Sequence, residues 1–191
     1  MKKLFFLVLT VLIVSCSSDD NNNVDDRRGN GDNNLAIRQS YKGGIIAYIF
    51  QPGDTGYVAG EQHGWIAATA NHSSAILWSN SSSNTNATDK TIGAGLTNTN
   101  TIIAALGSGN YAASIARDYN GGGYTDWFLP SKDELNQLYV NQAAIGGFVD
   151  DSYWSSTEVV YNYAWGQGFS YGSQFDGTKD YSNSVRAVRA F

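Results

Sequence analysis

The sequence predicts one α+β domain in which two or three helices pack on mainly antiparallel strands. Three observations support this prediction. Short apolar runs that are bounded by glycine or proline recur in the first half of the chain. A helix start with a capping box follows near residue 131. From residue 152 onward, large and small side chains alternate as they do in half-buried strands.

Three strands are expected in the first half of the chain, over residues 45–50, 64–68 and 75–78. The first of them ends before Pro52, because proline lacks the backbone N–H that a sheet needs. Residues 79–91 are mainly serine, asparagine and threonine and show neither a helical nor a strand period. This segment therefore predicts a long loop.

Two helices are expected after this loop. The first covers residues 99–106 and stops at Gly107, since glycine readily ends a helix. The second covers residues 111–119 and stops at the glycine run 121–123.

A third helix has the clearest start in the chain. Ser131 and Glu134 have the spacing of a capping box, in which each side chain satisfies a free backbone N–H of the other residue. The apolar stripe that follows consists of Leu135, Leu138 and Tyr139. We expect this helix to end near Gln142.

The C-terminal part of the chain predicts further strands. Residues 152–157 and 161–171 are expected to be strands, and Asp176-Gly177 is a hairpin turn signal. Residues 184–189 are expected to form a single final strand, with Val185 on one side.

The expected strand 161–171 has two interpretations. Its large side chains, all on one predicted face, are Tyr161, Tyr163, Trp165, Gln167, Phe169 and Tyr171. A row of aromatic rings is a candidate platform on which sugar rings stack. Such a row is also typical of the core of a half-buried sheet. Trp127 and Trp154 are expected in the core in either case.

The first residues predict export and lipidation. Lys2 and Lys3 precede an apolar run over residues 4–14, which is too short to span a bilayer as a permanent helix. The run closes at Ser15-Cys16, which resembles the cleavage and acylation site of bacterial lipoproteins. Residues 1–15 are therefore expected to be a signal peptide, and Cys16, the only cysteine, the site of lipidation.

The expected mature chain has two parts, a flexible tether over residues 16–40 and a domain over residues 41–191. The tether is rich in serine, aspartate and asparagine and has too few apolar side chains to form a core. Acidic residues directly after a lipidated cysteine resemble surface lipoproteins of the Bacteroidota. The expected location is the outer membrane, anchored by lipid at the cell surface, with the periplasmic face as the alternative.

The charge of the chain restricts its partners. Without Lys2 and Lys3, ten lysine and arginine residues remain against 17 aspartate and glutamate residues, a formal charge of −7. This balance disfavours nucleic acid and anionic lipid as electrostatic partners. Contact with the membrane is expected only through the lipid anchor.

Four motifs in order resemble one protein family. They lie at residues 126–135, 153–158, 164–165 and 185–189, and their sequences are DWFLPSKDEL, YWSSTE, AW and VRAVR. The chain is similar to the C-terminal domain family of Legionella collagen-like proteins and to the related repeated domain of Fibrobacter and Bacteroidota. The resemblance covers residues 41–191.

This resemblance implies a C-type-lectin-like fold, related to that of formylglycine-generating enzymes. It also implies adhesion or glycan binding as the theme of the family, and it transfers no catalytic residue. Many relatives have an arginine where this chain has Phe128, so a salt bridge at that position does not carry over. Cysteine-dependent copper and oxygen chemistry is not expected either, because the domain has no cysteine.

Three catalytic or metal-binding sites are alternatives to a binding domain. Residues 168–172 match G-x-S-x-G, but a nucleophile elbow needs a strand that turns into a helix, and Ser170 is expected within a β segment. His63 and His72 are the only histidines and lack metal-ligand spacing. A Ca²⁺ site at the acidic loop residues remains an alternative without a motif, so no cofactor is expected.

The resulting hypothesis is a surface-anchored, non-catalytic binding domain for a polysaccharide, glycoprotein or extracellular-matrix ligand. The candidate ligand-binding residues are Glu158, Asn162, Trp165, Gln167, Gln174 and Asp176. The alternatives are a structural role in envelope assembly and a serine-type hydrolase. The ligand and the oligomeric state remain open.

Overall fold

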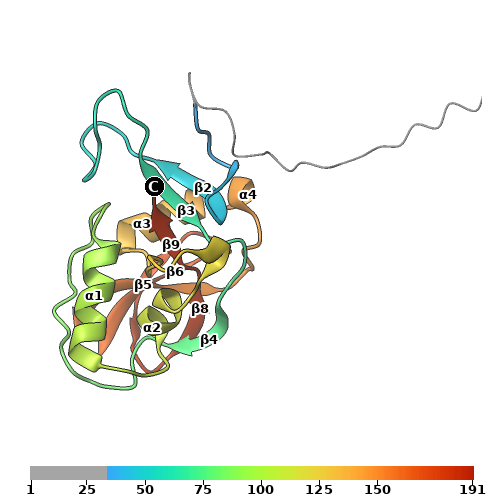
Figure 1. The fold of residues 1–191 in the computed structure, drawn as a ribbon. Helices are drawn as coiled ribbons and strands as arrows, with labels where there is room; N and C mark the ends of the chain where they lie inside the picture. Colours follow the sequence, from blue (N-terminus) through green and yellow to red (C-terminus); the bar gives the residue numbers. More distant parts are fainter. Residues whose placement is uncertain (1–33) are drawn as a thin grey trace, which may run out of the picture. The chain divides into compact units, whose positions relative to one another are not determined.

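The computed structural model describes residues 34–191, which fold as an α+β domain and confirm the predicted fold class (Figure 1). The strands are β1 (Ser40–Tyr41), β2 (Gly44–Ile49), β3 (Gly64–Ala67), β4 (Ser73–Leu77), β5 (Ser152–Val160), β6 (Tyr163–Gly168), β7 (Gln174–Thr178), β8 (Ser182–Val185) and β9 (Val188–Ala190). The helices are α1 (Gly95–Leu106), α2 (Ala112–Arg117), α3 (Lys132–Val140) and α4 (Gln142–Ile145), with one 3₁₀ turn at Gly121–Gly123.

The strands form two sheets. One has the order β1-β2-β3-β9 and the other the order β4-β8-β5-β6-β7. All pairs are antiparallel except β5 with β8. The last strand, β9, lies beside β3, so the C-terminus returns to the sheet that the chain forms first (Figure 1).

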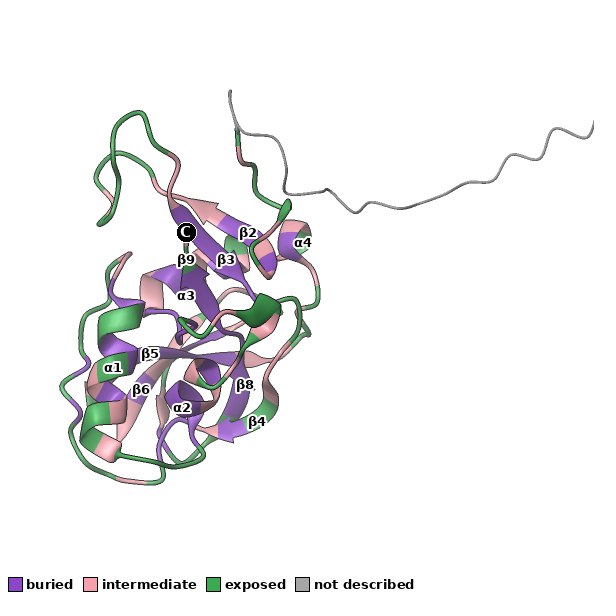
Figure 2. Ribbon diagram, viewed as in Figure 1, coloured by how far each residue is buried: buried purple, intermediate pink, exposed green. Residues whose placement is uncertain are grey.

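The core consists of two clusters of buried apolar side chains. One is centred on Trp127 and Trp154, which are fully buried as predicted. The other packs Leu135 and Leu138 of α3 against Tyr153 of β5. Figure 2 shows buried residues along β3, β5 and β9, the strands that connect the two clusters.

The early strands lie within one or two residues of their predicted limits, but two helices differ. Helix α1 begins at Gly95, four residues before the predicted start. The predicted single helix that starts at Ser131 is two helices, α3 and α4, because the chain leaves helical geometry at Asn141. The described part of the chain therefore has one α-helix more than predicted.

The predicted capping box is present, and its Glu134 carboxylate also binds backbone groups at the start of α1. The Glu134 backbone N–H donates to Ser131 Oγ, and the Ser131 N–H donates to Glu134 Oε2 at 2.8 Å. Glu134 Oε1 also accepts from the N–H groups of Gly93 and Gly95. Because Glu134 is completely buried, this carboxylate ties the start of α3 to the start of α1.

The C-terminal strands and turns differ from their predicted positions. Residues 161–162 and 169–171 are turns, so the predicted strand 161–171 shortens to β6. The predicted hairpin turn at Asp176-Gly177 is wrong: both residues pair with β6 inside β7. The chain turns at 179–181 instead, where the buried Lys179 fixes the turn.

The predicted single strand 184–189 is two strands in different sheets. The chain leaves β8 after Val185 and enters β9 at Val188. Between them, the Arg186 side chain turns inward and donates to the carbonyl of Ala68 at 2.7 Å. Alternation along a sequence does not show which sheet a residue joins. The pattern alone therefore could not predict that the chain changes sheets between Val185 and Val188.

The N-terminal predictions fall mainly on residues outside the described part. The signal peptide, Cys16 and most of the tether lie there. At least four residues of the predicted tether are joined to the domain: Ser40 is in β1, the Leu35 N–H donates to Gln62 Oε1 at 2.7 Å, and the backbones of Arg38 and Gln39 hydrogen-bond to Ile46. Within residues 34–191, no helix has the length and apolar character needed to cross a bilayer.

Candidate functional site

A buried ion pair organises one end of the second sheet. The Lys179 ammonium contacts the Glu158 carboxylate, and the two side chains are only 3% and 2% exposed. The ammonium also lies 4.6 Å from the centre of the Trp78 ring. Charged groups this deep are stable only when partners replace their lost hydration.

Backbone groups of two separate segments supply those partners. Glu158 accepts from the N–H groups of Thr85 and Asn86, at 2.9 and 2.7 Å. Lys179 donates to the carbonyls of Ser83 and Tyr161, at 3.0 and 2.9 Å. The pair therefore joins three segments: the loop after β4, the β5–β6 turn and the β7–β8 turn.

These three segments surround a polar depression, which we call the loop hollow. It is lined by Leu77, residues 79–82, Asn162 and residues 178–180, and its volume is about 350 Å³. Its lining residues are mainly serine, asparagine and threonine, and Asp180 adds an exposed carboxylate. Hydroxyl and amide groups both donate and accept hydrogen bonds, so the hollow suits a ligand with many hydroxyls.

Tyrosines stand next to the lining residues in the sequence. Tyr161 precedes Asn162 and is 54% exposed, while Tyr181 follows Asp180 and is 69% exposed. Exposed tyrosines are typical of binding surfaces, because the ring gives contact area at a small entropy cost.

Two of the six predicted ligand-binding residues are corrected to structural roles. Glu158 is buried in the ion pair. Gln167 is fully buried and donates to Asn136 Oδ1 of α3 and to the carbonyl of Gly172. Neither side chain is free to reach a ligand, since burial on the paired strands places both inside the domain.

Three other predicted residues share one sheet face. Trp165 pairs with Asp176 across β6 and β7, and Gln174 pairs with Gln167 in the same register. Directly opposed residues of an antiparallel pair project to the same side, so Trp165, Gln174 and Asp176 lie together. Asn162 is in the β5–β6 turn, where it lines the loop hollow.

The Trp165 ring is already occupied on its face. The ammonium groups of Lys90 and Lys132 lie 5.3 and 4.6 Å from its centre. Its Nε1 is buried and has no hydrogen-bond partner among residues 34–191. A sugar ring that stacked on Trp165 would have to displace these lysines, so the ring is a weaker platform than its sequence pattern indicated.

The predicted aromatic face of residues 161–171 does not exist as one surface. Phe169 is buried in the second core cluster, whereas Tyr171 is 91% exposed. Both residues lie in the turn after β6, where strand alternation no longer applies. Tyr161 lies in the preceding turn, so only Tyr163, Trp165 and Gln167 share a strand face.

The segment with the G-x-S-x-G pattern has a different geometry from a nucleophile elbow. Ser170 is exposed in the turn between β6 and β7, and no helix follows it. An elbow requires the serine at a strand-to-helix turn. Among the described residues, neither histidine has a hydrogen bond to Ser170: His63 contacts Glu61 and the Phe191 carbonyl, and His72 contacts the Ala70 carbonyl.

No group of three histidine, cysteine, aspartate or glutamate side chains within residues 34–191 is arranged to hold a metal ion. Asp151 is used structurally, since its Oδ2 accepts from Ser184 Oγ at 2.7 Å. The described residues therefore give the Ca²⁺ alternative no set of ligands.

Several motif residues behind the family resemblance are structural. Asp126 accepts two hydrogen bonds from Arg189, which lower the pKa of that carboxyl. Trp154 Nε1 donates to the Ile76 carbonyl inside the core. Arg186, also buried, donates to Asn71 Oδ1 at 2.9 Å. These motif residues therefore stabilise the fold, and their side chains are already engaged in hydrogen bonds within the domain.

The residues of the loop hollow were largely missed by sequence reasoning. Residues 79–82 were assigned only to a polar loop, and Lys179 was not singled out. A usable signal was present, because Glu158 is the only charged residue between Asp151 and Asp176, and Lys179 is the only basic residue between Lys132 and Arg186. Such isolated charges are candidates for a buried pair.

Two comparisons with known proteins bear on this domain. No curated protein matches the chain. The Lcl C-terminal domain family matches residues 67–189, well over half of the 191 residues, and this range contains the loop hollow. This protein therefore belongs to the Lcl C-terminal domain family.

Proposed function

We propose that the domain is a non-catalytic, glycan-binding adhesion module whose ligand sits in the loop hollow. One observation carries this proposal: a depression lined by hydroxyl and amide groups is built from three loops that a buried ion pair holds together. A site fixed before binding loses less conformational entropy when the ligand arrives.

The chemistry of the lining favours an uncharged polysaccharide. Ser81, Ser82 and Asn162 offer hydroxyl and amide groups that match sugar hydroxyls. Lys179 also lines the hollow, but its ammonium is engaged with Glu158 and two carbonyls. A polyanion in the hollow would thus be repelled by the Asp180 carboxylate, and no unpaired cation of the described lining would attract it.

In this proposal the protein is held at the outer membrane by acyl groups on Cys16, and the domain faces the cell exterior. The sequence of the first sixteen residues supports the anchor. A serine-rich and aspartate-rich tether after the cysteine would let the domain reach a polysaccharide, glycoprotein or matrix ligand beyond the membrane.

The test is an array of neutral and acidic glycans and matrix proteins, probed with the full-length protein in detergent. We expect binding to neutral glycans that EDTA does not change. Asn162→Ala should weaken this binding at least tenfold, since the amide loses its hydrogen bonds to the ligand. Trp165→Ala is the matched variant on the neighbouring sheet face and should bind as the wild type does.

Three outcomes would contradict the proposal. Loss of binding in Trp165→Ala but not in Asn162→Ala would move the site to the Trp165 face. Dependence on Ca²⁺ would assign recognition to a metal. Capture of an envelope protein in place of any glycan would favour the structural role. The anchor is tested separately, by mass spectrometry of Cys16 and by the protease sensitivity of the protein on intact cells.

A further inference from the structure

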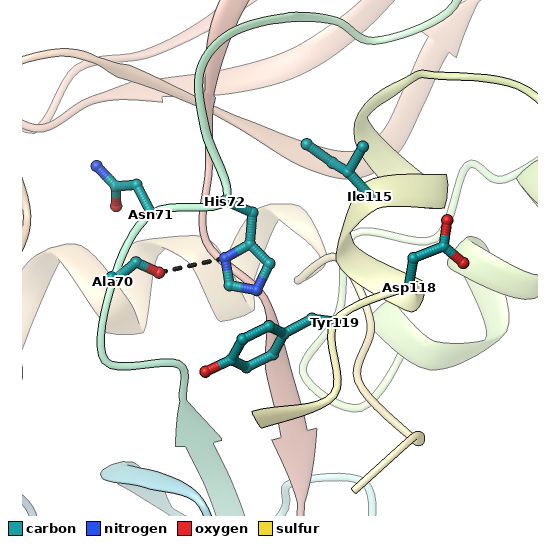
Figure 3. Close-up of a pocket in the computed structure, with 6 residues that line it drawn as sticks. All are labelled: Ala70, Asn71, His72, Ile115, Asp118 and Tyr119. Carbon is teal, nitrogen blue, oxygen red and sulfur yellow. Dashed lines mark hydrogen bonds between the residues drawn. The ribbon is translucent and has the colours of Figure 1, made fainter. Parts of the chain in front are cut away.

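A second pocket lies away from the loop hollow, between the segment after β3 and the end of helix α2 (Figure 3). Its volume is about 300 Å³, enough for a single sugar-sized ring. Figure 3 shows the His72 imidazole at its centre, next to the Tyr119 ring, with Ile115 and Asp118 on the helix side.

The hydrogen bond of His72 defines which ring nitrogen is left without a partner. Nδ1 lies 3.2 Å from the Ala70 carbonyl, an acceptor, so Nδ1 carries the proton. Nε2 is then a bare acceptor. It is buried, and no hydrogen-bond donor among residues 34–191 reaches it. An unpaired buried acceptor costs free energy, which a ligand donor would recover.

The burial of the imidazole keeps this acceptor neutral. Desolvation lowers the pKa of His72 to about 4, and the nearby Arg186 adds to the effect. The charged and titratable groups around the ring are Arg186 behind Asn71, Asp118 at the rim and the Tyr119 hydroxyl. Near neutral pH, His72 therefore accepts a hydrogen bond and does not carry a charge.

The remaining walls are complementary to the apolar face of a ring. The Tyr119 ring lies 4.1 Å from the imidazole centre and packs edge-on against Trp127. Ile115 adds an aliphatic wall. The exposed Asp118 carboxylate accepts no side-chain or backbone hydrogen bond from residues 34–191. Besides the Tyr119 hydroxyl, the pocket thus has two unpaired acceptors, His72 Nε2 and the anionic Asp118 carboxylate.

We propose that this pocket binds one amino sugar, separately from the loop hollow. A ring hydroxyl donates to His72 Nε2, the ammonium donates to the Asp118 carboxylate, and the C–H face packs on Tyr119 and Ile115. Because Nε2 has no exposed surface in this structure, the half-buried Tyr119 ring beside the imidazole turns to admit the ligand and then packs on its C–H face. The two acceptors favour a ligand rich in donors, and the carboxylate selects a cation over a neutral ring.

The chain has only two histidines, so ¹⁵N NMR of the imidazoles gives a direct test in the full-length protein. Glucosamine should shift the Nε2 resonance of His72 and leave that of His63 unchanged. Glucose and N-acetylglucosamine should bind at least tenfold more weakly, because neither has an ammonium for Asp118. The loop-hollow variant Asn162→Ala should respond to glucosamine as the wild type does, which separates this site from the proposed function.

Two variants complete the test. His72→Phe keeps an aromatic ring beside Tyr119 but has no acceptor, and we expect it to lose at least tenfold in glucosamine affinity. His72→Gln retains an acceptor oxygen and should lose less. An unchanged His72 resonance at saturating glucosamine would overturn the site even if the variants do not fold. Equal binding of glucose and glucosamine would refute the role of Asp118.

Discussion

The Glu158 carboxylate and the Lys179 ammonium form an ion pair inside the domain, although they are 21 residues apart in the chain. The pair is enclosed by four backbone groups from the loop after β4 and the β5–β6 turn. It therefore fixes the shape of the loop hollow without being available to a ligand. Glu158 therefore helps to build the site without lining it, whereas Lys179 does both.

Removing the cation of this pair should strongly destabilise the domain. Lys179→Met leaves the Glu158 carboxylate buried without its partner, so we expect a loss of about 3–5 kcal/mol in the free energy of unfolding. Urea denaturation measures it. Lys42→Met is the matched control, since that exposed lysine forms no ion pair among residues 34–191 and its ammonium lies 5.0 Å from the Tyr41 ring, so it should change stability by less than about 1 kcal/mol.

The double variant Lys179→Met/Glu158→Gln gives a further check on the same pair. Neutralising the carboxylate removes the unpaired charge, so the double variant should be more stable than Lys179→Met alone. Equal stability of the two would show that the lysine acts through packing against Trp78 and not through its charge.

Glu134 should make stability depend on pH. Burial raises the pKa of this carboxyl to about 7, although three backbone N–H groups act in the opposite direction. Between the unfolded value near 4.5 and pH 7, the folded state then binds more protons than the unfolded state. Stability should accordingly fall as pH rises through this range.

Glu134→Gln should remove this pH dependence. It should also cost about 1–3 kcal/mol, because an amide N–H₂ would face a backbone donor in place of a carboxylate oxygen. Asp133→Asn, at the exposed neighbouring position, serves as the control. Thermal unfolding between pH 5 and 7.5 compares the three proteins, and a slope that persists in Glu134→Gln would disprove the assignment.

His72 should contribute a slope of the opposite sign. Because the pKa of His72 is lowered to about 4, the unfolded state binds more protons between that value and 6.5. Stability should therefore decrease as pH falls through this window. The stability difference between wild type and His72→Phe, measured by urea denaturation at pH 4.5 and 7, should be more favourable to wild type at pH 7.

Two tryptophans on the second sheet should respond differently to truncation. Trp154 is fully buried in the core, so Trp154→Ala should lose about 3–5 kcal/mol of stability. Trp165 is half-buried and held by two lysines, so Trp165→Ala should lose about 1–2 kcal/mol and stay folded. Equal losses would mean that Trp165 belongs to the core.

Much of the fold followed from local sequence signals. The capping box of Ser131 and Glu134, the early strands and the two buried tryptophans were all predicted, because each depends on neighbours close in sequence or on simple burial. The β6–β7 hairpin was misplaced. Asp176-Gly177 has the composition of a turn, but pairing with Trp165 and Ala164 keeps it in a strand.

The candidate site was harder to predict for a physical reason. Asn162 and Trp165 were singled out because of their residue types, and the sequence alone determined that polar loops and aromatic side chains gather in the C-terminal part. Only the tertiary structure decided that Glu158 turns inward to Lys179, and that residues 79–82 meet Asn162 around one depression. Such contacts join segments about 80 residues apart, and no local propensity encodes the long-range packing that brings them together.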